Sequence, residues 1–87
     1  MEQLRLRTDE LKWREIEDEM VAVDVRNSTY LSANASATIL WRRLVSGATR
    51  DDLAAELVDR FGIGVDQART DVDAFVGDLG AQGLLEE

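Results

Sequence analysis

The spacing of apolar residues changes near Asn34, and this change restricts the possible folds more than any other feature of the sequence. Before Asn34 apolar and polar residues tend to alternate, as in strands with one buried face. After it apolar residues recur every three or four positions, as in amphipathic helices. Strands followed by helices, not alternating with them, indicate an α+β fold. Because 87 residues can enclose one core, we expect a single domain over residues 1–87.

The N-terminal part predicts three antiparallel strands in a meander. The clearest alternation sets Met20, Ala22 and Asp24 against Val21, Val23 and Val25. Polar segments at residues 17–19 and 26–29 have the composition of turns. We therefore predict strands over residues 12–17, 20–25 and 30–32. Residues 4–7 are a weaker candidate for an additional strand.

Three helices are expected to follow. Asn34 can cap a helix that ends at Gly47, and Thr49 with Asp52 resembles a capping box for a helix that ends at Gly62. Asp66 can cap a third helix that fades at Gly80 and Gly83. The apolar stripes of these helices are Ala37, Leu40, Trp41, Leu44 and Val45; Leu53, Leu57, Val58 and Phe61; and Ala68, Val72, Phe75, Val76 and Leu79. Leu84 and Leu85 are expected to pack under the core. A three-stranded antiparallel sheet followed by three helices is a winged helix-turn-helix-like arrangement.

Composition argues against an enzyme, a metal site or a cofactor. The chain has no Cys and no His, so it lacks a thiol nucleophile, an imidazole base and the usual zinc and haem ligands. No Ser stands in the Asp-Ser-Leu context of an acyl carrier protein, and no segment has the pattern of a calcium-binding EF-hand loop. No apolar run resembles a signal peptide or a membrane span, so the expected compartment is the cytoplasm.

Charge argues against nucleic acid as a partner. The net charge is −8, and most of the excess lies after residue 48. The third predicted helix, the expected recognition element of a helix-turn-helix protein, carries Asp66, Asp71, Asp73 and Asp78 against Arg69 alone. Phosphate contacts would need several basic groups there. A basic protein or peptide partner remains compatible with this surface.

The third predicted strand is an unprotected sheet edge. Tyr30, Leu31 and Ser32 bring no Lys, Pro or charge to it, so its unpaired backbone groups can template another strand. The alternative is that the edge is merely short, or that residues 4–7 cover it.

Several spaced segments resemble the PqqD family, the recognition elements for ribosomally synthesised and post-translationally modified peptides (RiPPs). The resemblance spans roughly residues 11–85. It rests on Tyr30-Leu31-Ser32-Ala33-Asn34-Ala35-Ser36, Trp41, Gly47-Ala48-Thr49, Leu57 with Phe61, Asp71-Val72 with Phe75, and Gly83-Leu84-Leu85. The chain departs from the family at three positions. It has Ser28, Ala33 and Ala37 where the family usually has Gly, Leu and Gly.

This resemblance implies a non-catalytic peptide chaperone. Such proteins bind the N-terminal leader of a precursor peptide as a strand added to their third strand and against their third helix. They present it to modifying enzymes, either a leader peptidase and cyclase of the lasso-peptide type or a radical SAM enzyme as in pyrroloquinoline quinone synthesis. The peptide-binding residues it implies are Tyr30, Leu31, Ser32, Ala33, Asp71, Val72, Phe75 and Asp78.

Within that set, Val72 and Phe75 are expected at the groove floor, although a purely structural role in the core is the alternative for both. Asp71 and Asp78 are expected to reach basic groups or backbone amides of the guest. A proline at Leu31 is expected to abolish leader binding by removing a backbone donor. The alternative function is a small acidic protein-binding regulator or antitoxin of helix-turn-helix ancestry.

Overall fold

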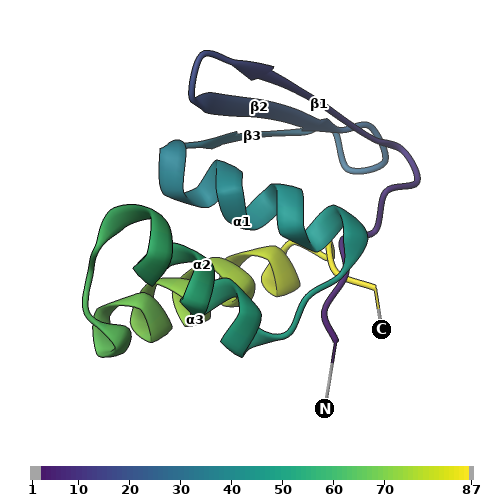
Figure 1. The fold of residues 1–87 in the computed structure, drawn as a ribbon. Coiled ribbons are helices and arrows are strands. Elements are labelled where there is room, and N and C mark those ends of the chain that lie inside the picture. Colours follow the sequence, from purple (N-terminus) through teal and green to yellow (C-terminus); the bar gives the residue numbers. More distant parts are fainter. Residues whose placement is uncertain (1–2, 87) are drawn as a thin grey trace.

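The computed structural model describes residues 3–86 and confirms the predicted α+β class and order of elements. The elements are β1 (Leu11–Ile16), β2 (Glu19–Asp24), β3 (Thr29–Ala33), α1 (Ala35–Ser46), α2 (Arg50–Phe61) and α3 (Val65–Ala81). The sheet lies above α1, and α2 and α3 lie on the other side of α1 (Figure 1). Each strand starts one residue earlier than predicted. None of the helices in this part of the chain is long and apolar enough to cross a membrane.

The sheet is an antiparallel meander in the order β1-β2-β3, so β1 and β3 are its two edges. The four-residue connection between β2 and β3 ends at Ser28, whose φ of 52° lies in the left-handed region. Only glycine adopts such a φ without a steric cost. This explains why a Gly would suit this position, where the resembled family usually has one. Ser28 adopts the same turn at a cost in steric strain.

The buried face of the sheet carries the methionine and alanine of β2, while its valines face outward. Met20 and Ala22 are buried, whereas Val21 is 42% exposed. On β1, Trp13 points inward and meets Trp41 of α1 edge-on, with ring centroids 5.7 Å apart. α1 therefore packs across the inner face of the sheet.

Side-chain caps define the starts of the first two helices as predicted. The Asn34 Oδ1 accepts from the Ala37 N–H at 3.0 Å. The Thr49 Oγ1 accepts from the Asp52 N–H at 3.0 Å, and the Asp52 carboxylate accepts from the Thr49 N–H at 3.1 Å. The predicted Asp66 cap is wrong, because α3 begins at Val65 with Gly64 as its N-cap. Asp66 lies in the first turn, where its charge still complements the helix dipole.

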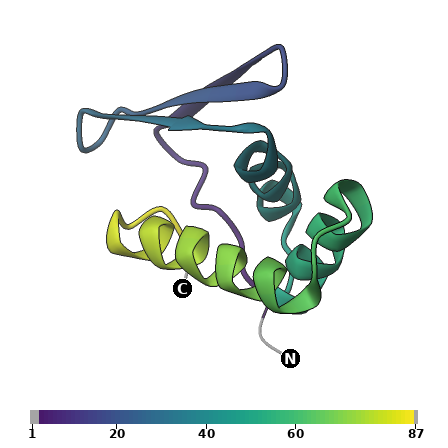
Figure 2. The same cartoon turned by 90° about the vertical axis from the view of Figure 1, so that its left-hand side faces the viewer.

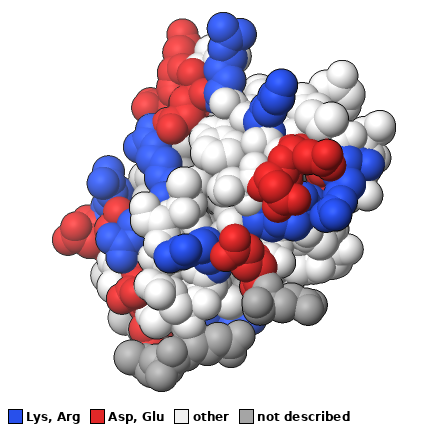
Figure 3. Space-filling view, turned by 90° about the vertical axis from the view of Figure 1, so that its right-hand side faces the viewer, with Lys and Arg blue, Asp and Glu red and all other residues white. Residues whose placement is uncertain are grey.

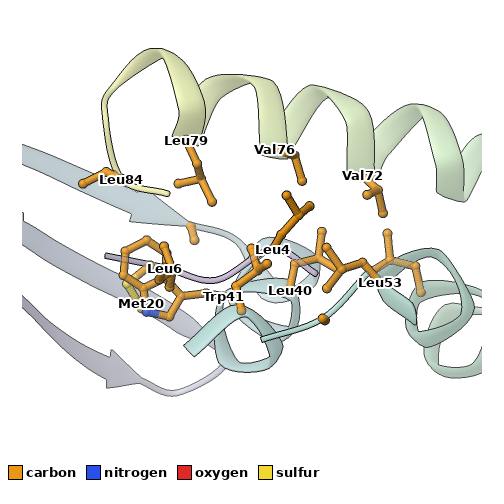
Figure 4. Close-up of a cluster of buried hydrophobic side chains, with 14 of the residues drawn as sticks. Leu4, Leu6, Met20, Leu40, Trp41, Leu53, Val72, Val76, Leu79 and Leu84 are labelled. Atoms are coloured by element: carbon orange, nitrogen blue, oxygen red, sulfur yellow. The ribbon is translucent and has the colours of Figure 1, made fainter. Parts of the chain in front are cut away.

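The N-terminal segment belongs to the core and not to the sheet. The prediction of an additional strand at residues 4–7 is wrong, since Leu4 and Leu6 form only isolated bridges with Ala48 and Leu85. Figure 4 shows Leu4 and Leu6 between α1 and α3, with the buried side chains of α3 pointing toward them. Leu84 is fully buried beside them, as expected. This segment therefore leaves the β3 edge uncovered.

Phe61 is the clearest failure among the predicted core residues. It is 44% exposed, although it continues the apolar stripe of Leu53 and Leu57, both of which are buried. It is the last residue of α2, and the chain turns away at Gly62, which has a φ of 65°. The stripe therefore extends one helical turn past the core.

Asp24 is a buried carboxylate that connects distant parts of the chain. It is 2% exposed, and its Oδ2 accepts from the Asn27 Nδ2 at 2.8 Å and from the Arg7 Nη2 at 3.3 Å. The Arg7 Nε also donates to the Gly83 carbonyl at 2.9 Å. The N-terminal segment, the β2–β3 connection and the C-terminal turn are thus joined at one point.

Acidic and basic side chains are interspersed on the face seen in Figure 3, the side on which the two termini lie.

Candidate functional site

The hydrogen-bond register identifies which backbone groups of β3 face the open edge. The Val25 N–H donates to the Glu10 carbonyl at 2.8 Å, one step beyond the Leu11–Asp24 pair. In an antiparallel pair, hydrogen-bonded and non-bonded positions alternate along the strands. The odd-numbered residues 19–25 therefore bond to β1, and the even-numbered residues 20–24 direct their N–H and C=O groups toward β3.

The same alternation continues on β3. Thr29, Leu31 and Ala33 lie opposite Asp24, Ala22 and Met20, so their backbone groups are bonded to β2. Tyr30 and Ser32 direct their N–H and C=O groups toward the free edge. The side chains alternate as well: Leu31 and Ala33 point inward, while Tyr30 lies on the outer face with 78% of its surface exposed.

A groove of about 210 Å³ lies between β3, α1 and the C-terminal half of α3. Figure 2 shows β3 as the strand of the sheet that faces this half of α3. Most of its lining residues are apolar, and its polar members are Ser32, Asn34, Asp78 and Gln82. Its lining residues are Met20, Leu31, Ser32, Ala33, Asn34, Ala37, Trp41, Phe75, Asp78, Leu79 and Gln82.

The structure brings five of the eight predicted site residues together in this groove. They are Leu31, Ser32, Ala33, Phe75 and Asp78. Tyr30 is beside it and offers backbone groups to the edge. Val72 is 1% exposed and lines no part of the groove, so its predicted place at the floor is wrong and its structural alternative holds.

Asp71 lies in an adjoining hollow of about 350 Å³, which we call the side pocket. The side pocket is lined by Asn34, Ala35, Ser36, Leu57, Phe61, Ile63 and Asp71. It shares Asn34 with the groove. Asp71 also precedes Phe75 by one helical turn, so both lie on the same flank of α3.

Six groove residues are not among the predicted site residues: Met20, Asn34, Ala37, Trp41, Leu79 and Gln82. The sequence does contain a signal for two of them, because Leu79 and Gln82 follow Phe75 and Asp78 at helical spacing. The contributions of Ala37 and Trp41 depend on how α1 crosses the sheet, which local periodicity does not reveal.

The carboxylates on the groove side of α3 carry no counter-charge from the described residues. Neither Asp71 nor Asp78 takes part in an ion pair there. On the opposite flank, Asp73 pairs with Arg50 at 2.8 Å, and Arg69 lies 3.9 Å from Asp51. Asp78 in the groove and Asp71 beside it are therefore the carboxylates of this flank that a basic guest could pair with.

The other edge of the sheet carries charged residues along β1. Lys12, Arg14 and Glu15 lie there, and Glu15 forms an ion pair with Arg42 of α1. The hydrogen bond from Arg42 lowers the pKa of the Glu15 carboxyl, which keeps this pair charged. Charged edges resist strand addition. This difference favours β3 over β1 as the place where a guest strand can add.

A larger hollow of about 700 Å³ lies between α2 and the start of α3. It has no residue in common with the groove and includes no strand edge. Asp51 and Asp52, two of its carboxylates, are already engaged by Arg69 and by the backbone of Thr49. We therefore regard the smaller groove as the candidate site.

Comparison with known proteins supports this view of the fold. The chain is similar to a solved structure of lasso peptide synthetase B1 complexed with the leader peptide, with 27% identity, a TM-score of 0.81, and coverage of 97% of this chain and 98% of that chain. It has the same fold as TbiB1 in complex with the TbiA(beta) leader peptide, with 21% identity, a TM-score of 0.84 and 94% coverage of both chains. A comparison with curated proteins found no match.

The family comparison agrees with the resemblance seen in the sequence. The model of coenzyme PQQ synthesis protein D (PqqD) matches residues 19–85, which include β2, β3 and all three helices. The match therefore includes the open edge, the groove and the side pocket. The chain belongs to the PqqD family.

Proposed function

We propose that this protein is a RiPP recognition element, a non-catalytic chaperone that binds the leader of a precursor peptide and presents it to modifying enzymes. The observation that carries the proposal is the uncharged β3 edge beside an apolar groove. The similar lasso peptide synthetase B1, which is 27% identical, was solved with a leader peptide.

The leader would bind as a fourth strand along β3. The N–H and C=O groups of Tyr30 and Ser32 would form the new ladder, which gives affinity with little dependence on guest sequence. Every second guest side chain would then point inward, over Leu31 and toward Phe75 and Leu79 of the groove. Specificity would come from how well those side chains fit the groove.

Charge would add a second contribution to recognition. Asp78 faces the groove without a cationic partner among the described residues, and Asp71 lies nearby on the same flank of α3. A Lys or Arg of the guest beside either carboxylate would form a charge-assisted hydrogen bond. Binding should therefore weaken as salt screens this attraction.

The second partner would be an enzyme that acts on the bound precursor. Binding both molecules raises the effective concentration of the precursor at the enzyme without any catalytic group on this chain. The lasso peptide relative favours a leader peptidase and cyclase over a radical SAM enzyme. The alternative of an acidic regulator or antitoxin explains neither the uncharged β3 edge nor the groove.

Leader binding can be tested by fluorescence polarisation. The probe is a labelled leader from the short precursor gene nearest to the gene for this chain, with a scrambled version as the control. We expect saturable binding of the leader and at least tenfold weaker binding of the scrambled peptide. Phe75→Ala should weaken leader binding. Val65→Ala should not, because Val65 is the first residue of α3 and lies outside the groove. Equal binding of both peptides to the folded protein would contradict the proposal.

A further inference from the structure

We propose that the larger hollow between α2 and the start of α3, which we call the α2–α3 hollow, is a docking surface for the cyclase. This inference rests on the proposed leader-binding function. The occupant would be an exposed segment of the cyclase that carries an apolar side chain beside a Lys or Arg.

The α2–α3 hollow has the space and the apolar floor that a protein segment needs. Its volume is about 700 Å³, compared with about 210 Å³ for the groove. Ala54 is buried at its base, Val58 is partly buried, and Val65 is 54% exposed at its side. Covering Val65 would remove apolar surface from water, which favours binding. A helical turn or a loop of a partner would fill this space, whereas a single side chain would leave most of it empty.

The charges around the α2–α3 hollow favour a basic partner. Together α2 and α3 carry eight acidic side chains and three arginines. Carboxylates are also in excess among the charged residues that line the hollow, which are Asp51, Asp52, Glu56 and Asp59 against Arg43 and Arg69. A basic segment would therefore be attracted to this surface, and an acidic segment would be repelled.

Asp59 is the carboxylate of the hollow that is most available to a partner. It is exposed and forms no ion pair with the other residues that the structure describes. Arg69 lies 3.9 Å from Asp51, and both side chains are largely exposed. Because exposed pairs of this kind contribute little to stability, a Lys or Arg of the partner can take the place of Arg69 beside Asp51.

The α2–α3 hollow stays free when a leader is bound. It shares no residue with the groove. Figure 2 shows the β2–β3 turn above the C-terminal end of α3, with α2 and the start of α3 at the opposite end of the molecule. The leader and a partner enzyme can therefore be held at the same time, as a gain in effective concentration requires.

The direction of the leader separates the two enzymes. The sheet is antiparallel throughout, and antiparallel pairing is slightly more stable per residue than parallel pairing. β3 runs from Thr29 to Ala33, so an antiparallel leader ends near Thr29 and the β2–β3 turn. A leader peptidase has to reach this end of the leader to cut it. The α2–α3 hollow lies at the other end, so it suits the cyclase and leaves room for the peptidase.

The test measures how tightly the full chain binds the cyclase encoded beside its gene, by microscale thermophoresis with a saturating concentration of the leader. We expect wild type to bind saturably. Asp59→Lys should weaken binding by about tenfold, because it sets a like charge against the basic segment. Val65→Ala should weaken it by about threefold, because it removes apolar contact. Both variants should bind the labelled leader as wild type does.

The matched control for charge is Glu10→Lys, which makes the same change at an exposed residue outside the α2–α3 hollow. It should bind the cyclase as wild type does. Circular dichroism should show that all three variants remain folded. Asp59→Lys should fold well, because a Lys in the last turn of α2 complements the helix dipole.

Three results would contradict the inference while leader binding stands. They are cyclase binding that neither Asp59→Lys nor Val65→Ala weakens, no binding of the cyclase by wild type, and a loss of leader peptidase binding in place of cyclase binding. If the folded wild type does not bind the leader, the proposed function itself fails.

Discussion

At the scale of single residues, Asp24 is the buried charge with the most consequences. The hydrogen bond from Asn27, aided by the Arg7 guanidinium, holds the pKa of its carboxyl below the ordinary value despite the opposing effect of burial. A carboxyl whose pKa is lower in the folded state stabilises the fold above its ordinary pKa of about 3.9. That stabilisation is lost as the pH falls through the lower, folded-state value.

Asp24→Asn should therefore lower the melting temperature at neutral pH. The deficit relative to wild type should begin to shrink below about pH 4, where Asp24 of the unfolded chain becomes protonated, and should shrink further as the pH falls through the lower folded-state pKa. Thermal unfolding followed by circular dichroism across this pH range would measure the difference. A deficit that stays constant down to the lowest pH would show that the charge of Asp24 contributes nothing.

The capping box at the start of α2 is a second local interaction that should contribute measurably to stability. Thr49 and Asp52 satisfy one another's backbone donors, and the bond from the Thr49 N–H lowers the pKa of the Asp52 carboxyl. Thr49→Ala should lower the free energy of unfolding by about 1 kcal/mol. Urea unfolding would measure this change, and Thr49→Ser, which keeps the hydroxyl, should restore most of it.

At the scale of elements, β3 combines two roles on alternate residues. The Leu31 N–H belongs to the ladder with β2, whereas the Ser32 N–H faces the open edge. The prediction that a proline at Leu31 would abolish leader binding by removing an edge donor is therefore wrong, because the Leu31 N–H is not at the edge. That substitution would break the sheet's own hydrogen bond and destabilise the domain.

Ser32→Pro is the sharper test of strand addition. It removes an edge donor while leaving the β2–β3 bonds in place, so leader binding should fall at least tenfold in a folded protein. Ser32→Ala, which keeps the N–H, should bind nearly as wild type does. Fluorescence polarisation together with circular dichroism would separate these outcomes. Normal leader binding by Ser32→Pro would exclude strand addition at this edge.

At the scale of the whole molecule, the N-terminal segment joins the two layers of the fold. Leu6 is fully buried between α1 and α3, with Leu84 beside it (Figure 4). Leu6→Ala should lower the free energy of unfolding by about 2–5 kcal/mol, a large share of the stability of a small domain. Ile16→Ala, at an exposed strand end, should cost less than about 1 kcal/mol. Urea unfolding of both variants would test the contrast.

Sequence patterns predicted the elements well because their determinants are local. The capping oxygens of Asn34 and Thr49 act within three residues, and the glycines at 47 and 62 end helices through their own backbone freedom. The same reasoning failed for Phe61, whose stripe position is helical but lies beyond the packed neighbours. It also failed for residues 4–7, whose alternation of leucine and arginine fits a strand as well as a core-filling extended segment.

The sequence by itself determined the α+β class, the order of elements and the absence of charge from the third strand, because each follows from residue type and spacing. Only the tertiary structure decided which backbone groups of β3 are free, that Val72 is buried while Phe75 faces the groove, and that Asp71 and Asp78 form no ion pair with the described residues. These properties depend on register and on how helices cross the sheet. Both come from contacts between residues far apart in the chain, which local periodicity does not encode.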